Sequence, residues 1–112
     1  MDESPTCGKI TVAPEVLETI ARLTALAVPG VVRLTPPLGF QRLLGIQDGV
    51  QVIVSDGRVA VELHIVAESG RDILALGRQI QHEVTRAIED IVGLPVTHVN
   101  VTVEDVVPAP KD

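Results

Sequence analysis

Two runs of alternating apolar and polar residues, 50–55 and 58–68, flank the dipeptide Asp56-Gly57. Alternation with a period of two predicts strands with one buried face, and Asp-Gly suits the two-residue type I′ turn of a β-hairpin. This turn would pair Ser55 with Arg58 and Val50 with Leu63. The apolar partners then share one face, and the polar residues share the other: Gln51, Ser55, Arg58, Glu62 and His64. A shift of one residue would mix the two sets, so turn and pattern predict the same register.

Two segments with apolar residues at helical spacing surround this hairpin. Residues 14–28 begin with Pro14, a residue favoured at the first helical position, and end before Pro29-Gly30. The predicted core-facing positions of this helix are Val16, Leu17, Ile20, Leu23, Thr24 and Ala27. In the second helix, Ser69 with Asp72 three residues later resembles a capping box. Its predicted apolar stripe contains Ile73, Leu76, Gly77, Ile80, Val84, Ala87, Ile88 and Ile91.

Three further segments are candidate strands. Residues 96–106 and, more briefly, 8–13 alternate in polarity, and residues 31–35 form a short candidate whose place in the sheet stays open. The predicted order is β-α-(β)-β-β-α-β. It indicates an α+β fold in which a mainly antiparallel sheet carries both helices on one face. The other face would be exposed unless a partner covers it.

The chain has 112 residues, the size of one ordinary domain. We expect this domain at 8–106, between a disordered tail at 1–7 and a C-terminal tail at 107–112. The longest apolar run, 24–32, is shorter than the roughly 20 residues needed to cross a bilayer. The N-terminus lacks the apolar core of a secretory signal, so the sequence predicts a cytoplasmic location.

Charge and motif content argue against several functional classes. Nine Lys and Arg stand against fifteen Asp and Glu, a net charge of −6, which disfavours binding to nucleic acid. The sequence contains no nucleophile elbow (GxSxG), phosphate-binding loop (GxxxxGK) or dinucleotide-binding motif (GxGxxG). We therefore expect no catalytic residues, no cofactor and no enzymatic activity.

The best metal-ligand candidates are two histidines and two glutamates on the polar side of the predicted strands: His64, His98, Glu62 and Glu104. Such residues would suit zinc if neighbouring strands brought them together. No CxxC or HExxH motif and no third ligand at a fixed spacing accompanies them. We therefore expect His64 and His98 to be ordinary exposed residues on a solvated face, and His82 to be solvated on its helix.

Residues 36–49 form a long connection for so small a domain, and we expect this loop to be mobile. It holds the only aromatic residue of the chain and several leucines. One interpretation is a flap that covers an open edge of the core, and the other is an apolar contact for a partner. The candidate partner-binding residues are Leu38, Phe40, Arg42, Leu43 and Leu44. Because Arg42 is the only cation among them, a protein partner is favoured over anionic lipid.

Several segments together resemble the alkaline shock protein family of bacterial cell-envelope and general stress proteins. Residues 8–21, followed by Val-Pro-Gly-Val at 28–31, resemble its opening, and 49–67 continue the similarity. In the closing segment, 80–103, the pattern Val-x-x-Val-Asn-Val-x-Val is the most specific part. The chain differs at Ser69-Gly70, where members often have an aromatic residue before the glycine.

This resemblance implies a small, cytoplasmic, non-enzymatic α+β domain that associates with the membrane through a membrane-anchored partner. The main hypothesis is an interaction module that binds such a partner, or further copies of itself, through the exposed sheet face, a strand edge or the 36–49 loop. The alternative is a regulatory domain that binds a small molecule or lipid in a cleft between the two helices and the loop.

Overall fold

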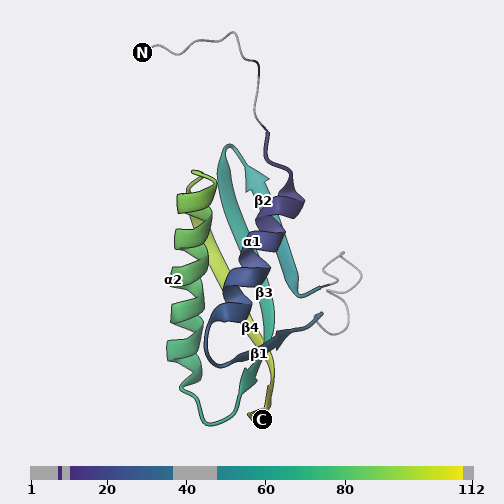
Figure 1. The fold of residues 1–112 in the computed structure, drawn as a ribbon, viewed down its shortest axis with the longest axis vertical. Helices are drawn as coiled ribbons and strands as arrows, with labels where there is room; N and C mark the ends of the chain where they lie inside the picture. Colours follow the sequence, from purple (N-terminus) through teal and green to yellow (C-terminus); the bar gives the residue numbers. More distant parts are fainter. Residues whose placement is uncertain (1–7, 9–10, 37–47, 110–112) are drawn as a thin grey trace.

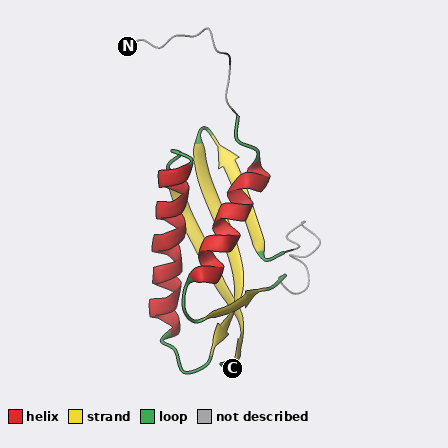
Figure 2. Ribbon diagram, in the orientation of Figure 1, coloured by secondary structure: helices red, strands yellow, loops and turns green. Residues whose placement is uncertain are grey.

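A computed structural model describes residues 8, 11–36 and 48–109. Two helices lie side by side on one face of a four-stranded sheet, which confirms the predicted α+β fold (Figures 1 and 2). The elements in chain order are α1 Pro14–Ala27, β1 Val31–Leu34, β2 Val50–Ser55, β3 Arg58–Glu68, α2 Ile73–Ile91 and β4 Val96–Val107.

The central strand, β3, pairs with all three other strands. The predicted hairpin register is confirmed, from Ser55 opposite Arg58 to Val50 opposite Leu63. Asp56 and Gly57 both have positive φ, 53° and 74°, as a type I′ turn requires. Beyond β2, on the same edge of β3, β1 pairs antiparallel with residues 65–67. The short candidate strand after the first helix is therefore part of the sheet.

The other edge of β3 pairs with β4, and this pair is parallel. A helical crossover, α2, returns the chain to the end of the sheet where β3 began, so β4 runs in the same direction. The sheet is thus mainly antiparallel, as predicted, with one parallel pair. The register of β4 shifts at Thr97 and again at Glu104, where one extra residue bulges from the strand.

The two ends of the domain differ from the predicted segments. Residues 11–13 precede α1 without forming a strand, and residues 9 and 10 lie outside the described residues, as do 1–7 and 110–112. At the other end, β4 continues to Val107, into the stretch expected to be a tail.

The core lies between the helices and the sheet, and the side of α1 that faces it is rotated from the predicted one, although Leu17 is buried and Ile20 packs against the core as predicted. The buried residues of α1 are Leu17, Ala21 and Ala25, spaced four apart, whereas Leu23 is 62 % exposed. Small alanine side chains allow the helix to approach its neighbours closely, so the larger residues on the adjoining side point outward. The prediction that Val16, Leu23 and Ala27 face the core was wrong, because all three are exposed.

The second helix follows its prediction more closely. Leu76, Ile80, Val84 and Ile88 are buried in the core. The N-cap is Asp72 rather than Ser69, because its Oδ1 accepts a hydrogen bond from the Ala75 N–H at 3.1 Å. Ile91, at the end of the predicted stripe, is 69 % exposed.

Candidate functional site

The face of the sheet opposite the helices divides into an exposed half and a closed half. The exposed half carries mostly polar side chains: Ser55, Arg58, His98, Asn100 and Thr102. Asn100 Nδ2 donates a hydrogen bond to Glu62 Oε2 at 2.6 Å across β3 and β4. In the closed half, His64 is 3 % exposed and Val66 1 % exposed. The expectation of an open reverse face therefore holds for only part of it.

His64 belongs to β3 and lies beside the end of β1 and the start of β2. Its N–H donates to the Gly49 carbonyl at 2.8 Å, and its own carbonyl accepts from the Thr35 N–H at 3.0 Å. Both hydrogen bonds lie on the same side of β3, at the two ends of the 36–48 connection. The backbone of His64 thus holds together the points from which this connection leaves the sheet and to which it returns.

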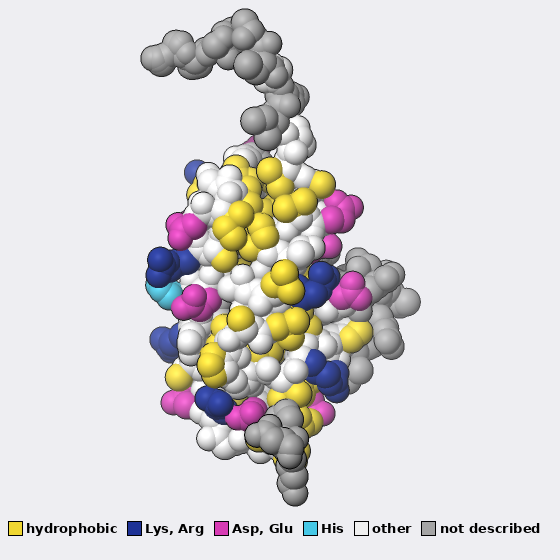
Figure 3. All heavy atoms as spheres, in the orientation of Figure 1, with side chains coloured by type: hydrophobic (Ala, Val, Ile, Leu, Met, Phe, Trp, Pro, Cys, Tyr) yellow, Lys and Arg dark blue, Asp and Glu magenta, His cyan; other side chains and the backbone are white. Residues whose placement is uncertain are grey.

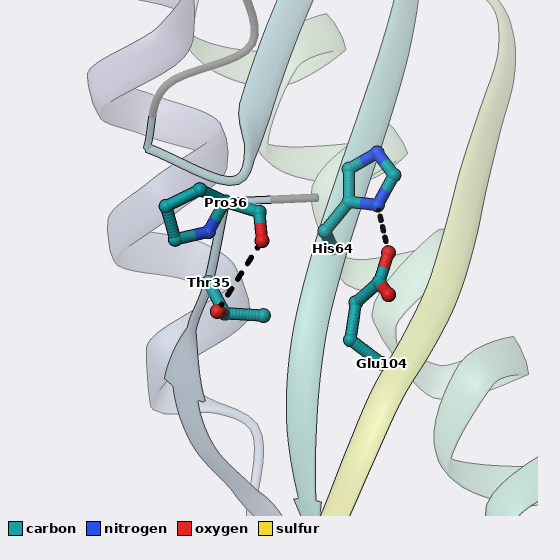
Figure 4. A network of polar contacts seen from close by, with 4 residues as sticks. All are labelled: Thr35, Pro36, His64 and Glu104. Carbon is teal, nitrogen blue, oxygen red and sulfur yellow. Dashed lines mark hydrogen bonds and ion pairs between the residues drawn. The ribbon is translucent and has the colours of Figure 1, made fainter. Parts of the chain in front are cut away.

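The side chain of His64 pairs with Glu104 of the second β4 bulge (Figure 4). His64 Nδ1 lies 2.7 Å from Glu104 Oε2, and the two side chains are 3 % and 19 % exposed. The carboxylate accepts this hydrogen bond, which satisfies a polar group that would be costly to bury alone. The bulge matters because it adds the residue whose side chain reaches across to β3.

The expectation that His64 is an ordinary exposed residue was wrong, while His98 and His82 are exposed as predicted. The structure does not bring His64 and His98 together, because His98 lies opposite Ala60 whereas His64 lies opposite Thr102. Within the described part of the chain, no three His, Cys, Asp or Glu side chains are grouped closely enough to hold a metal ion. The arrangement at His64 is a single buried hydrogen-bonded pair.

Replacing Glu104 with alanine should lower the free energy of unfolding by about 1–3 kcal/mol, since His64 Nδ1 would stay buried without its partner. Urea unfolding followed by circular dichroism measures the change. Asn100→Ala is the matched control: it removes a side-chain bond from the same strand at an exposed position, and should cost no more than about 0.5 kcal/mol. Equal losses in the two variants would contradict a structural role for the His64–Glu104 pair.

Shallow hollows indent the described surface. A groove of about 460 Å³ runs between α2 and β4, lined by Ile73, Leu74, Gly77, Arg78, Gln81, Val101 and Val103. A hollow of about 270 Å³ between the helices is lined by Thr24, Ala27, Val28, Pro29, Gln79 and Glu83. A smaller one, about 130 Å³, lies beside Glu104 and Pro36. The largest of these is therefore at the sheet edge and not between the helices, where the small-molecule alternative expected a cleft.

The predicted partner-binding residues of the 36–49 loop lie outside the described residues, and their role stays a prediction. They are Leu38, Phe40, Arg42, Leu43 and Leu44. The described flanks, Thr35 and Gly49, are both bonded to His64.

Sequence reasoning missed several exposed apolar residues on the two helices. On α1, Val16, Leu23 and Leu26 are exposed, and on α2, Leu74 and Ile91. Hydrophobic side chains gather on this face of the molecule (Figure 3). Helical periodicity alone could not reveal them, because Val16 and Leu23 fit a predicted stripe that the observed packing rotates away from the core. No helix within the described residues is both long and apolar enough to span a bilayer.

Comparisons with known proteins agree with the resemblance read from the sequence. The chain matches the alkaline shock protein family, described as having a cell envelope-related function, over residues 2–108. The uncharacterized protein YqhY of Bacillus subtilis (strain 168) is 26 % identical over 107 residues, which cover 90 % of this chain and 79 % of YqhY.

Among solved structures, the fold is similar to the MamM CTD. Its M250L variant superposes with a TM-score of 0.53 and 14 % identity, covering 81 % of this chain and 95 % of that one. Its H264E variant gives a TM-score of 0.52 and 13 % identity, covering 81 % and 93 %. At such identities the likeness concerns the fold alone. The family match spans nearly the whole sequence, and we conclude that the chain belongs to the alkaline shock protein family.

Proposed function

We propose that this chain is a non-enzymatic interaction module that binds a membrane-anchored protein as part of the family's cell envelope-related function. The observation that carries the proposal is the exposed apolar side of α1, formed by Val16, Leu23 and Leu26. These residues recur at helical spacing on one solvent-facing side, while the opposite side of the helix packs on the core through its alanines. Grouped apolar side chains on a water-exposed helix are typical of a protein contact.

Charge favours a protein surface over a lipid surface as the occupant of this face. The chain carries a net charge of −6, and the acidic Glu15 directly precedes Val16 in the first turn of α1. An anionic membrane surface repels such a chain, because basic residues supply most of the attraction of peripheral proteins to anionic lipid. Association with the membrane would therefore come from a protein anchored in it.

The 36–49 loop is a second proposed contribution to the same contact. Its candidates are Leu38, Phe40, Arg42, Leu43 and Leu44. Both ends of this connection are bonded to His64 at a fixed place in the sheet, which supports a role for the loop as a positioned recognition segment.

The test is capture of a partner from detergent-solubilised membranes of the source organism. Leu23→Ser combined with Leu26→Ser is expected to lower recovery of a protein with a membrane-spanning segment by at least about tenfold, because both side chains lie on the proposed contact. Ile53→Ser is the matched control, because it makes an apolar-to-serine change at a side chain that is 52 % exposed on the face of the sheet opposite the helices, and it should leave recovery unchanged. Equal recovery by the double variant, or recovery only of proteins without a membrane span, would contradict the proposal.

A parallel variant separates the two interpretations of the loop. Phe40→Ser with Leu43→Ser is expected to abolish capture while the melting temperature stays unchanged, because the apolar side chains would contact the partner. A fall in melting temperature with capture retained would indicate a flap over the core instead.

A further inference from the structure

The outer edge of β4 is unpaired within the described residues. This strand has 12 residues and bonds to β3 along its inner edge, while β1 and β2 occupy the far side of β3. Long unprotected edges readily accept another strand, and proteins usually shield them with lysine, proline or bulges. β4 has bulges at Thr97 and Glu104, but the stretch between them, 98–103, is regular and contains no lysine, arginine or proline.

The hydrogen bonds of β3 show which backbone groups of β4 face outward. His64 directs its N–H and carbonyl toward Gly49 and Thr35, so the even-numbered residues in this part of β3 face β1 and β2. Its odd-numbered residues face β4, and in a parallel pair each bonds to the two neighbours of its register partner. Leu63, opposite Val101, therefore bonds to residues 100 and 102.

It follows that three valines present their N–H and carbonyl groups to the outside: Val99, Val101 and Val103. One of these carbonyls already has an outside partner, since Gln81 Nε2 of α2 donates to the Val99 oxygen at 3.0 Å. The side chains of all three valines lie on the helix side of the sheet, against the core.

This edge is complementary to a second copy of itself. In an antiparallel pair with Val101 at the two-fold axis, Val101 faces Val101 and Val99 faces Val103, so every outward-facing valine meets a valine. On the reverse face the same register sets Asn100 beside Thr102 and His98 beside Glu104 of the other copy. Shifting the register by two residues in either direction leaves one of these valines without a valine partner and separates His98 from Glu104.

The groove of about 460 Å³ beside this edge supports the same occupant. It is lined on β4 by Val101 and Val103 and has a wall of five α2 residues: Ile73, Leu74, Gly77, Arg78 and Gln81. Ile73 and Leu74 continue the apolar surface of the strand onto the helix. Leu74 is 73 % exposed, the highest fraction among the large exposed apolar residues. A second copy of the chain paired at β4 would bring its own helix layer against this wall and cover it.

We propose that two copies of this chain associate through antiparallel pairing of β4 with β4, in the register centred on Val101. A two-fold axis perpendicular to the sheet joins the two four-stranded sheets into one and keeps all helices on the same side. Val103 of the second copy then donates to the Val99 carbonyl in place of Gln81. The inference rests on the proposed interaction function but uses a different surface from the α1 contact.

The first test is sedimentation velocity of the full chain across a concentration series. Val101→Pro should raise the dissociation constant at least about tenfold, because it removes an outward N–H at the axis. It leaves the β3 bonds of β4 intact, since the Val101 N–H does not face β3. Leu74→Glu, an exposed substitution in the first turn of α2, should weaken association without affecting the fold. Circular dichroism of both variants checks that the fold is retained.

The second test determines the register. In a Cys7→Ser background, Asn100→Cys mixed with Thr102→Cys should form a disulfide-linked dimer on mild oxidation, because the two positions face each other as a non-hydrogen-bonded pair. Asn100→Cys alone is the matched control and should cross-link far less, since in this register it does not face itself.

Three outcomes would overturn the proposal: a wild-type chain that is monomeric throughout, a dimer unaffected by both Val101→Pro and Leu74→Glu, or equal cross-linking in the mixture and the control. The proposed function is tested by a separate result. Capture of a membrane-anchored partner through α1 does not need the β4 edge, so Val101→Pro should leave that capture intact.

Discussion

Replacing Gly49 with alanine is expected to lower the free energy of unfolding by about 3 kcal/mol or more, which would leave little of a small domain's stability. Gly49 has a φ of +79°, and a Cβ built on it would lie 2.6 Å from the Thr35 carbonyl oxygen and 2.9 Å from the His64 carbonyl oxygen. Both are backbone atoms of hydrogen-bonded strands, so they cannot move without disturbing the junction of β1, β2 and β3. Urea unfolding with linear extrapolation measures the loss.

Gly57→Ala separates conformational strain from collision. Gly57 has nearly the same φ, +74°, but a Cβ there would meet nothing within 4 Å. We expect it to cost about 1–2 kcal/mol, the penalty of a left-handed conformation for a residue with a side chain. If Gly49→Ala cost no more than Gly57→Ala, the close approach of the three strands at Gly49 would not be the reason for the glycine.

The second large effect is expected for Leu63→Ala, which should destabilise the chain by about 2–5 kcal/mol. Leu63 is fully buried near the middle of β3, with Val50 and Val101 opposite it on the two neighbouring strands. Shortening this side chain to a methyl group loses apolar burial and leaves a cavity that strands on both sides prevent from closing. Thermal and urea unfolding at equal protein concentration would give the difference.

Leu74→Ala is the matched control, because it makes the same chemical change at a side chain that is 73 % exposed. It should change the free energy of unfolding by no more than about 0.5 kcal/mol. The comparison is made at a concentration where the chain is monomeric, since Leu74 also lies in the proposed dimer contact. A similar loss in both variants would contradict the position of Leu63 in the core.

The β-hairpin shows what local sequence can predict well. Its register follows from Asp56-Gly57 and the alternation on either side, both of which lie within a few residues of the contacts that they specify. The helix spans were predictable for the same reason, from Pro14 at one start and Gly93 after the other end. Turns, caps and periodicity are local, so they can be read without knowing the fold.

The side of α1 that meets the core was not predictable in this way. Leu23 and Ala25 both fit plausible helical stripes, and the choice between them depends on how closely the helix approaches α2 and the sheet. The close approach favours alanine inside and leucine outside. The exposed apolar residues of the proposed binding face followed from that choice, so sequence periodicity could not have found them.

The amino-acid sequence by itself determined the helices, the hairpin with its register and the family, because each depends on neighbouring residues or on the order of residues along the chain. Only the tertiary structure decided that β4 runs parallel to β3, that its bulge at Glu104 meets a buried His64, and that the edge at Val99, Val101 and Val103 is left free among the described residues. The physical reason is that these features join residues about 40 positions apart. Their pairing depends on the path of the α2 crossover and the packing of the helix layer, which no local pattern encodes.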